Sequence, residues 1–82
     1  MERKTAAKAV TDVMTSVGIS QKKLADKMGL KAQQAVFNML NAKNGMRVDN
    51  FIKALDVLGY DVIIRNRVTD EEMQIVRGAD TE

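Results

Sequence analysis

Two short amphipathic segments that meet near a glycine constrain the fold of this chain more than any other feature. The first runs from Ile19 to Leu30 and contains Gly29, and the second runs from Lys31 to Leu40. Ser20 is typical of a helix N-cap, and a glycine at position 29 is typical of a left-handed helix end. Ala25 lies four residues before that glycine and is small enough for a second helix to pack closely across the first. We therefore expect two short helices joined by a glycine turn.

Helical periodicity continues on both sides of this pair. It predicts a first helix from Thr5 to Val17, ended by Gly18, a third helix from about Ala32 to Ala42, and a fourth from about Val48 to Leu58, ended by Gly59. Asn44-Gly45 predicts a turn before the fourth helix. The apolar residues expected to face the core are Ala6, Val10, Val13, Met14, Val17, Leu24, Ala25, Met28, Val36, Met39, Leu40, Val48, Phe51, Ile52, Leu55 and Leu58.

A β-type segment follows Gly59. Residues 60–68 are rich in β-branched side chains and predict one strand, whereas Thr69-Asp70-Glu71-Glu72 predicts the capping box of a short helix that runs to Val76. A lone strand leaves its backbone hydrogen bonds unmade, so its partner is expected in a second copy of the chain or in the sheet edge of another protein. The residues expected at a homodimer interface are Tyr60, Val62, Ile63, Ile64 and Arg65.

Charge is divided unevenly along the 82 residues. Residues 1–68 hold twelve Lys or Arg against six Asp or Glu, and residues 69–82 hold one Arg against five acids. A basic body attracts phosphate groups, and an acidic tail can lie over a basic face. The alternative is that both regions are ordinary solvated surface.

Several classes of protein are not expected from the composition. The chain has no Cys and no His, which excludes disulfides and thiolate metal sites and removes the commonest general base. No paired acids, nucleophile or phosphate-binding loop accompanies the aspartates, so neither enzyme activity nor a cofactor or metal is expected. No apolar run exceeds three residues, so we expect no signal peptide and no membrane span. A cytoplasmic protein is the default.

The outward face of the predicted helix at 32–42 carries side chains suited to base edges. Gln33, Gln34 and Asn38 can donate and accept together, as the N6 and N7 groups of adenine in the major groove require. Phe37 on this face could lie against a thymine methyl group. Basic side chains expected near flanking phosphates are Lys22, Lys23, Lys27, Lys31, Lys43 and Arg47. This combination predicts contact with duplex DNA.

The order of these motifs resembles the phage repressor and Cro type of helix-turn-helix family (XRE-like). Ser20-Gln21, Leu24-Ala25 and Gly29 match the signature of that family's second helix, and Gln33-Gln34 resembles a glutamine pair at the start of the recognition helix. Residues 50–59 resemble the last core helix. The resemblance covers about residues 5 to 60. Each motif alone is weak, but the ordered set is specific.

The resemblance implies a mostly α fold with four or five helices, in which residues 1–59 form a helix-turn-helix domain and residues 60–82 form a dimerisation extension. It further implies a homodimeric regulator of transcription, repressor-like, that binds double-stranded operator DNA in a bacterial or phage setting, associated with the nucleoid. The expected base contacts are Gln33, Gln34, Phe37 and Asn38. The expected phosphate contacts are Gln21, Lys22, Lys31, Asn41, Lys43, Asn44 and Arg47.

Two departures from the family pattern leave alternatives open. The turn after Gly29 is one residue longer than usual, so the register of the glutamine pair could shift by one. Phe37 stands where the family usually has a polar residue, so its ring could be buried instead of contacting a base. A second function also remains open, namely a protein-interaction module of antitoxin or anti-defence type that binds a toxin or another regulator through the exposed strand.

Overall fold

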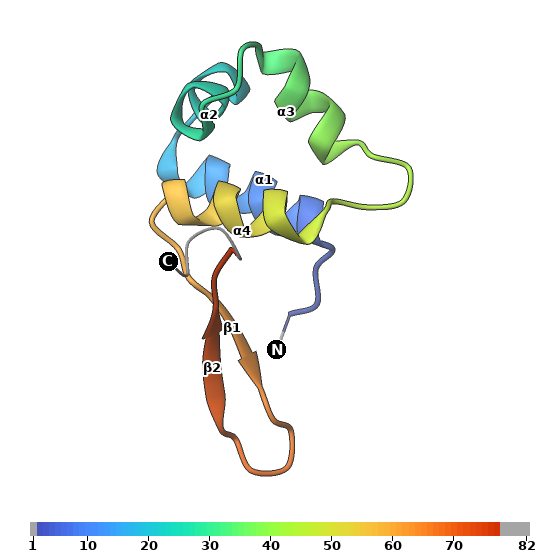
Figure 1. Ribbon diagram of the computed structural model, residues 1–82, viewed down its shortest axis with the longest axis vertical. Coiled ribbons are helices and arrows are strands. Elements are labelled where there is room, and N and C mark those ends of the chain that lie inside the picture. The colour runs from blue at the N-terminus through green and yellow to red at the C-terminus, as the bar shows by residue number, and fades with distance from the viewer. Residues whose placement is uncertain (1, 78–82) are drawn as a thin grey trace.

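A computed structural model of the chain describes residues 2–77, which form four helices followed by a two-stranded antiparallel sheet (Figure 1). The mostly helical character predicted from the sequence is confirmed. No helix within these residues is both long and apolar enough to cross a membrane. The elements are α1 (Ala6–Val17), α2 (Gln21–Met28), α3 (Gln33–Leu40), α4 (Val48–Val57), β1 (Val62–Arg65) and β2 (Glu72–Ile75).

Capping residues set the ends of the first two helices, and those predicted from the sequence include Ser20 and Gly29. Thr5 Oγ1 accepts a hydrogen bond from Lys8 N at the start of α1, and Ser20 Oγ accepts one from Lys23 N at the start of α2. At the end of α2, Gly29 takes the left-handed conformation with a φ of 75°. Glycine adopts this conformation without steric cost, which lets the chain turn toward α3.

Each helix contributes at least one fully buried side chain to the core. Val10 of α1, Leu24 of α2, Val36 of α3 and Ala54 of α4 each have no exposed surface. Other buried residues around them include Met14, Ala25, Met28, Met39, Leu55 and Leu58. The periodicity of the sequence predicted most of this set, but not Ala54.

Two of the predicted core residues lie outside the core. Val48 is 67% exposed and Val17 is 49% exposed. Each occupies a helix end: Val48 is the first residue of α4 and Val17 is the last residue of α1. Their spacing along the helix is correct, but the neighbouring helices do not cover these end turns.

The prediction of a short helix at residues 69–76 is wrong. Residues 72–75 form β2, which pairs with β1, so β1 has its ladder partner within the same chain. The strand therefore does not need a partner from another molecule to complete its backbone hydrogen bonds, as the sequence had suggested. The predicted strand is also shorter than residues 60–68, since its paired part covers only residues 62–65.

A local turn explains why a hairpin forms where a helix was expected. Asn66 Oδ1 accepts hydrogen bonds from Val68 N and Thr69 N, and Asn66 N donates to Glu71 O over 2.8 Å. Asp70 has a φ of 63°, a left-handed conformation that aspartate tolerates better than most residues. These bonds reverse the chain before a helical turn can begin at Thr69.

The hairpin has one apolar and one polar face. The register pairs Val62 with Ile75 and Ile64 with Met73, and these four apolar side chains share a face because side chains alternate along a strand. The pairs Ile63 with Gln74 and Arg65 with Glu72 lie on the opposite face. The hairpin extends away from the helices, at the end of the molecule opposite α2 and α3 (Figure 1).

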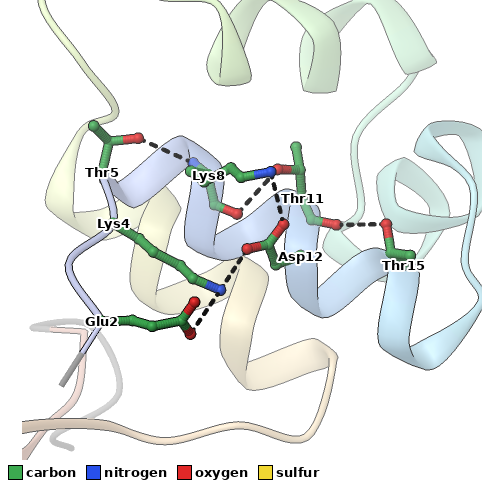
Figure 2. Close-up of polar contacts among 7 residues, drawn as sticks. All are labelled: Glu2, Lys4, Thr5, Lys8, Thr11, Asp12 and Thr15. Atoms are coloured by element: carbon green, nitrogen blue, oxygen red, sulfur yellow. Dashed lines mark hydrogen bonds and ion pairs between the residues drawn. The ribbon is translucent and has the colours of Figure 1, made fainter.

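A cluster of charges ties the N-terminal segment to α1 (Figure 2). The Lys4 ammonium donates to Asp12 Oδ2, Lys8 Nζ lies 3.1 Å from Asp12 Oδ1, and Lys4 Nζ also lies 3.5 Å from Glu2 Oε1. The hydrogen bonds from Lys4 and Lys8 hold the pKa of Asp12 below its usual value, and the bond to Asp12 raises the pKa of Lys4.

This cluster predicts a small dependence of stability on acidic pH. A carboxyl whose pKa is lowered by folding stabilises the folded state above its unfolded pKa of about 3.9. That stability is lost as the pH falls through the lower pKa of the folded state. Asp12→Asn is therefore expected to lower the thermal unfolding midpoint slightly at neutral pH, and the difference from wild type should vanish in strong acid. Asp26→Asn is the control, because Asp26 makes no ion pair among residues 2–77. Equal effects of the two changes at neutral pH would contradict the assignment.

Candidate nucleic-acid interface

The outward face of α3 carries all four residues predicted to contact bases. Gln33, Gln34, Phe37 and Asn38 are exposed, whereas Val36 and Met39 of the same helix are buried in the core. The Phe37 ring is 48% exposed, so the alternative of a buried ring is wrong. The structure therefore brings the four predicted residues onto one accessible surface, which we call the α3 face.

Two residues of the α3 face bind each other. Gln34 Nε2 donates a hydrogen bond of 3.0 Å to Asn38 Oδ1, one helical turn further along. This bond uses one of the two N–H groups of the Gln34 amide and leaves its Oε1 acceptor free for a ligand. Asn38 in turn keeps its own Nδ2 donor. The bond restrains the Gln34 side chain, so that the amide presents an acceptor and a donor side by side.

The start of α3 adds positive potential beside this face. The helix begins at Gln33, and its N-cap residue Ala32 makes no side-chain hydrogen bond to the first turn. The first N–H groups of a helix without such a cap are open to an acceptor from outside, and the helix dipole favours an anion there. The Lys31 side chain is exposed at the same helix end.

The cations around the α3 face have no acidic partners among the residues that the structure describes. Residues 19–47 contain six Lys or Arg and one acid, Asp26. None of these six cations takes part in an ion pair within residues 2–77. The exposed cations of the region are Lys22, Lys23, Lys27, Lys31, Lys43 and Arg47. Their charge is thus available to an external anion.

The polar residues predicted to contact phosphates differ in exposure and in the hydrogen bonds that they already make. Gln21 is half-buried at the first position of α2, and Asn44 is exposed in the turn in which Gly45 N donates to Ala42 O. Asn41 is the C-cap of α3, and its Nδ2 donates to Phe37 O over 2.8 Å. One of its two amide donors therefore stabilises the helix end.

The residues predicted for a dimer interface lie far from the α3 face. They belong to the hairpin segment, which occupies the opposite end of the molecule (Figure 1). Tyr60, Ile63, Ile64 and Arg65 are exposed, whereas Val62 is half-buried against the core. Sequence reasoning missed Met73, which pairs with Ile64 and is 62% exposed. The alternating residues of the segment 72–75 were the available signal for this second strand.

Comparisons of the chain with protein-family models, curated proteins and solved structures find no match. The resemblance to the repressor and Cro type of helix-turn-helix therefore stays a prediction.

The position of Asn41 predicts a role in stability. Asn41→Ala removes the hydrogen bond to Phe37 O and is expected to lower the free energy of unfolding by about 0.5–1.5 kcal/mol. Urea denaturation followed by circular dichroism measures this change. Asn44→Ala is the matched control, because the Asn44 side chain makes no hydrogen bond among the described residues, and it should leave the midpoint unchanged. An unaltered midpoint for Asn41→Ala would show that the cap contributes nothing.

Proposed function

We propose that this chain is a sequence-specific double-stranded DNA-binding protein that regulates transcription, most simply as a repressor, without enzymatic activity. The observation that carries the proposal is the α3 face, where exposed amide side chains and an aromatic ring lie together among cations that make no ion pair within residues 2–77. An α-helix with such a face fits the major groove of B-DNA.

Base recognition is assigned first to Gln34. Its Oε1 can accept from adenine N6, and the N–H that is not bonded to Asn38 can donate to adenine N7. The bond to Asn38 fixes the amide before DNA arrives, so less side-chain freedom is lost on binding. Gln33 and the free Nδ2 of Asn38 would reach neighbouring bases. The exposed Phe37 ring offers apolar contact to a thymine methyl group.

Phosphate contacts would come from both ends of the α2–α3 unit. The open N-terminus of α3 and Lys31 supply one anion-binding end, and Gln21 and Lys22 at the start of α2 supply another. Lys43, Asn44 and Arg47 follow α3 and would contact the backbone on the far side of the groove. Asn41 retains one donor for the same purpose. Such contacts fix the position of the helix on the duplex and carry no sequence information.

We also propose that the chain acts as a homodimer through the hairpin. The basis differs from the one expected from the sequence, because β1 already has an intrachain partner. What supports the dimer is the apolar surface that the hairpin leaves uncovered, since Ile64 is 49% exposed and Met73 is 62% exposed. A two-stranded hairpin is marginally stable by itself and gains from further pairing or packing.

Substitution of the amide pair tests base recognition. Gln34→Ala is expected to cost about 1–3 kcal/mol of specific affinity and to relax preference at one base pair. Asn38→Ala should weaken the same preference less, because it removes the restraint on Gln34 and leaves the Gln34 amide in place. Selection of bound duplexes from a random library, followed by titration of the selected site, measures both effects. Asn50→Ala on α4 is the matched control, because Asn50 is an amide residue that lies on neither the α3 face nor the hairpin. Unchanged preference in both α3 variants would refute base reading by this face.

A salt titration tests the phosphate contacts separately. Affinity for random duplex DNA should fall steeply with salt, because binding releases counterions. Lys43→Ala is expected to weaken binding to all sequences alike and to lower the slope of log affinity against log salt by about 1. Arg67→Ala removes the same charge in the hairpin turn, at the other end of the molecule, and should change neither quantity. Identical slopes for wild type and Lys43→Ala would contradict the assignment.

The exposed hairpin also favours a second candidate function, a protein-interaction module that binds a toxin or another regulator. An unpaired sheet edge beside apolar side chains is a suitable surface for strand addition. The two functions separate in the same titration. Absence of any salt-dependent binding to duplex DNA would leave the interaction module as the better proposal.

A further inference from the structure

The free edge of β1 has a definite set of outward-facing backbone groups. Asn66 N donates to Glu71 O, and pairs with and without hydrogen bonds alternate along an antiparallel ladder. The pairs Ile64 with Met73 and Val62 with Ile75 are therefore the next two bonded pairs. It follows that the outer edge of β1 presents the backbone N–H and C=O groups of Ile63 and of the residues two positions before and after it, Asp61 and Arg65.

The side chains on this edge carry opposite charges on either side of Ile63. Asp61 lies two residues before Ile63 and Arg65 lies two residues after it, so all three share the polar face of the hairpin. All three are also exposed. A two-fold axis at Ile63 would exchange the two charges. The edge is therefore complementary to itself when two copies run antiparallel.

We propose that two copies of this chain join through the outer edges of β1, antiparallel and centred on Ile63. Asp61 then lies opposite the partner's Arg65, and the same pair occurs again across the two-fold axis. The two hairpins form one four-stranded sheet with β1 strands in the centre. This proposal rests on the dimer proposed above and gives its register, but it does not depend on DNA binding.

The same register would also cover exposed side chains on the apolar face of the hairpin. Val62 would lie opposite the partner's Ile64, with their side chains in contact across the strands. Val62 is half-buried because it packs against the helical core. The partner's Ile64, placed beside it, would approach the same helical surface. The isoleucine that is 49% exposed in one chain thus becomes covered in the dimer.

The outer edge of β2 lacks this complementarity. Its outward-facing residues on the polar face are Glu72, Gln74 and Val76, by the same alternation. An antiparallel pair centred on Gln74 would place Glu72 opposite the partner's Val76, so no opposite charges meet along this edge. Among the two edges of the hairpin, the charge pattern therefore favours β1.

Charge reversal at the two positions tests the register. Asp61→Arg alone leaves arginine opposite arginine in the homodimer, and Arg65→Asp alone leaves aspartate opposite aspartate. Each single variant is expected to weaken the dimer roughly tenfold, because like charges replace attraction in two symmetry-related cross-strand pairs. Mixing the two variants restores both complementary pairs. The mixture is therefore expected to form a heterodimer about as tight as the wild-type dimer.

The readout is sedimentation equilibrium of the full chain without DNA, with differently tagged variants in the mixture. Asp61 accepts a hydrogen bond from Gln74, and Arg65 faces Glu72 within its own hairpin, so each reversal also perturbs the monomer. Mixing does not repair those local changes, so recovery in the heterodimer reports the contact between subunits. Circular dichroism of each variant shows whether the helices remain folded.

Gln74→Arg is the matched control for the choice of edge. It adds a charge to the outer edge of β2 but keeps a donor for Asp61, so it should weaken the dimer far less than either reversal, whereas it would disrupt a dimer centred on Gln74. A monomeric wild-type chain, an unaffected dimer in both reversal variants, or a mixture without heterodimer would each overturn the proposal. None of these outcomes bears on base reading by α3, which the DNA selection tests independently.

Discussion

The packing of four buried side chains, one from each helix, is the constraint on which the rest of this structure depends. Val36 fixes the rotation of α3 by entering the buried cluster that also contains Leu24, Val10 and Ala54. Once Val36 faces inward, helical geometry places Gln34 and Asn38 on the opposite side of α3 and Phe37 beside them. Gln33 lies one turn before Val36 and is exposed at the first position of the helix. The polar surface of α3 is thus a consequence of core packing. A substitution in this core would alter the orientation of that surface as well as the stability of the domain.

The helical part of the fold could be predicted because its signals are local. Caps such as Ser20, turn glycines such as Gly29, and apolar periodicity act within one or two helical turns, and each was confirmed. The hydrogen bond between Gln34 and Asn38 was equally available from the sequence, since amide side chains four residues apart on a helix can reach each other. The assignment of both residues to the same exposed face did follow from periodicity.

The C-terminal part was not predictable in the same way. Thr69 and Glu72 have the spacing of a capping box, and a local criterion favours a helix there. The outcome depends instead on pairing between residues about ten positions apart, such as Ile64 with Met73, and on the Asn66 side chain that closes the turn. The only local signal for this pairing is the polar and apolar alternation of residues 72–75, and four residues are too few to outweigh the capping-box pattern before them. That Asp61 and Arg65 lie along a free sheet edge could not be predicted either, because this edge is defined only by the pairing of β1 with β2.

The separation of the hairpin from α3 has a consequence for the length of any DNA site. In a dimer joined through β1, the strand register sets the distance between the two α3 helices. A slip of two residues would displace one subunit along the strand by about 6.8 Å, which is the rise of about two base pairs. The opposite charges at positions 61 and 65 would then select a spacing between half-sites as well as a partner. In such a dimer, a shift of the β1 register would alter the spacing between half-sites while leaving the base preference of α3 unchanged.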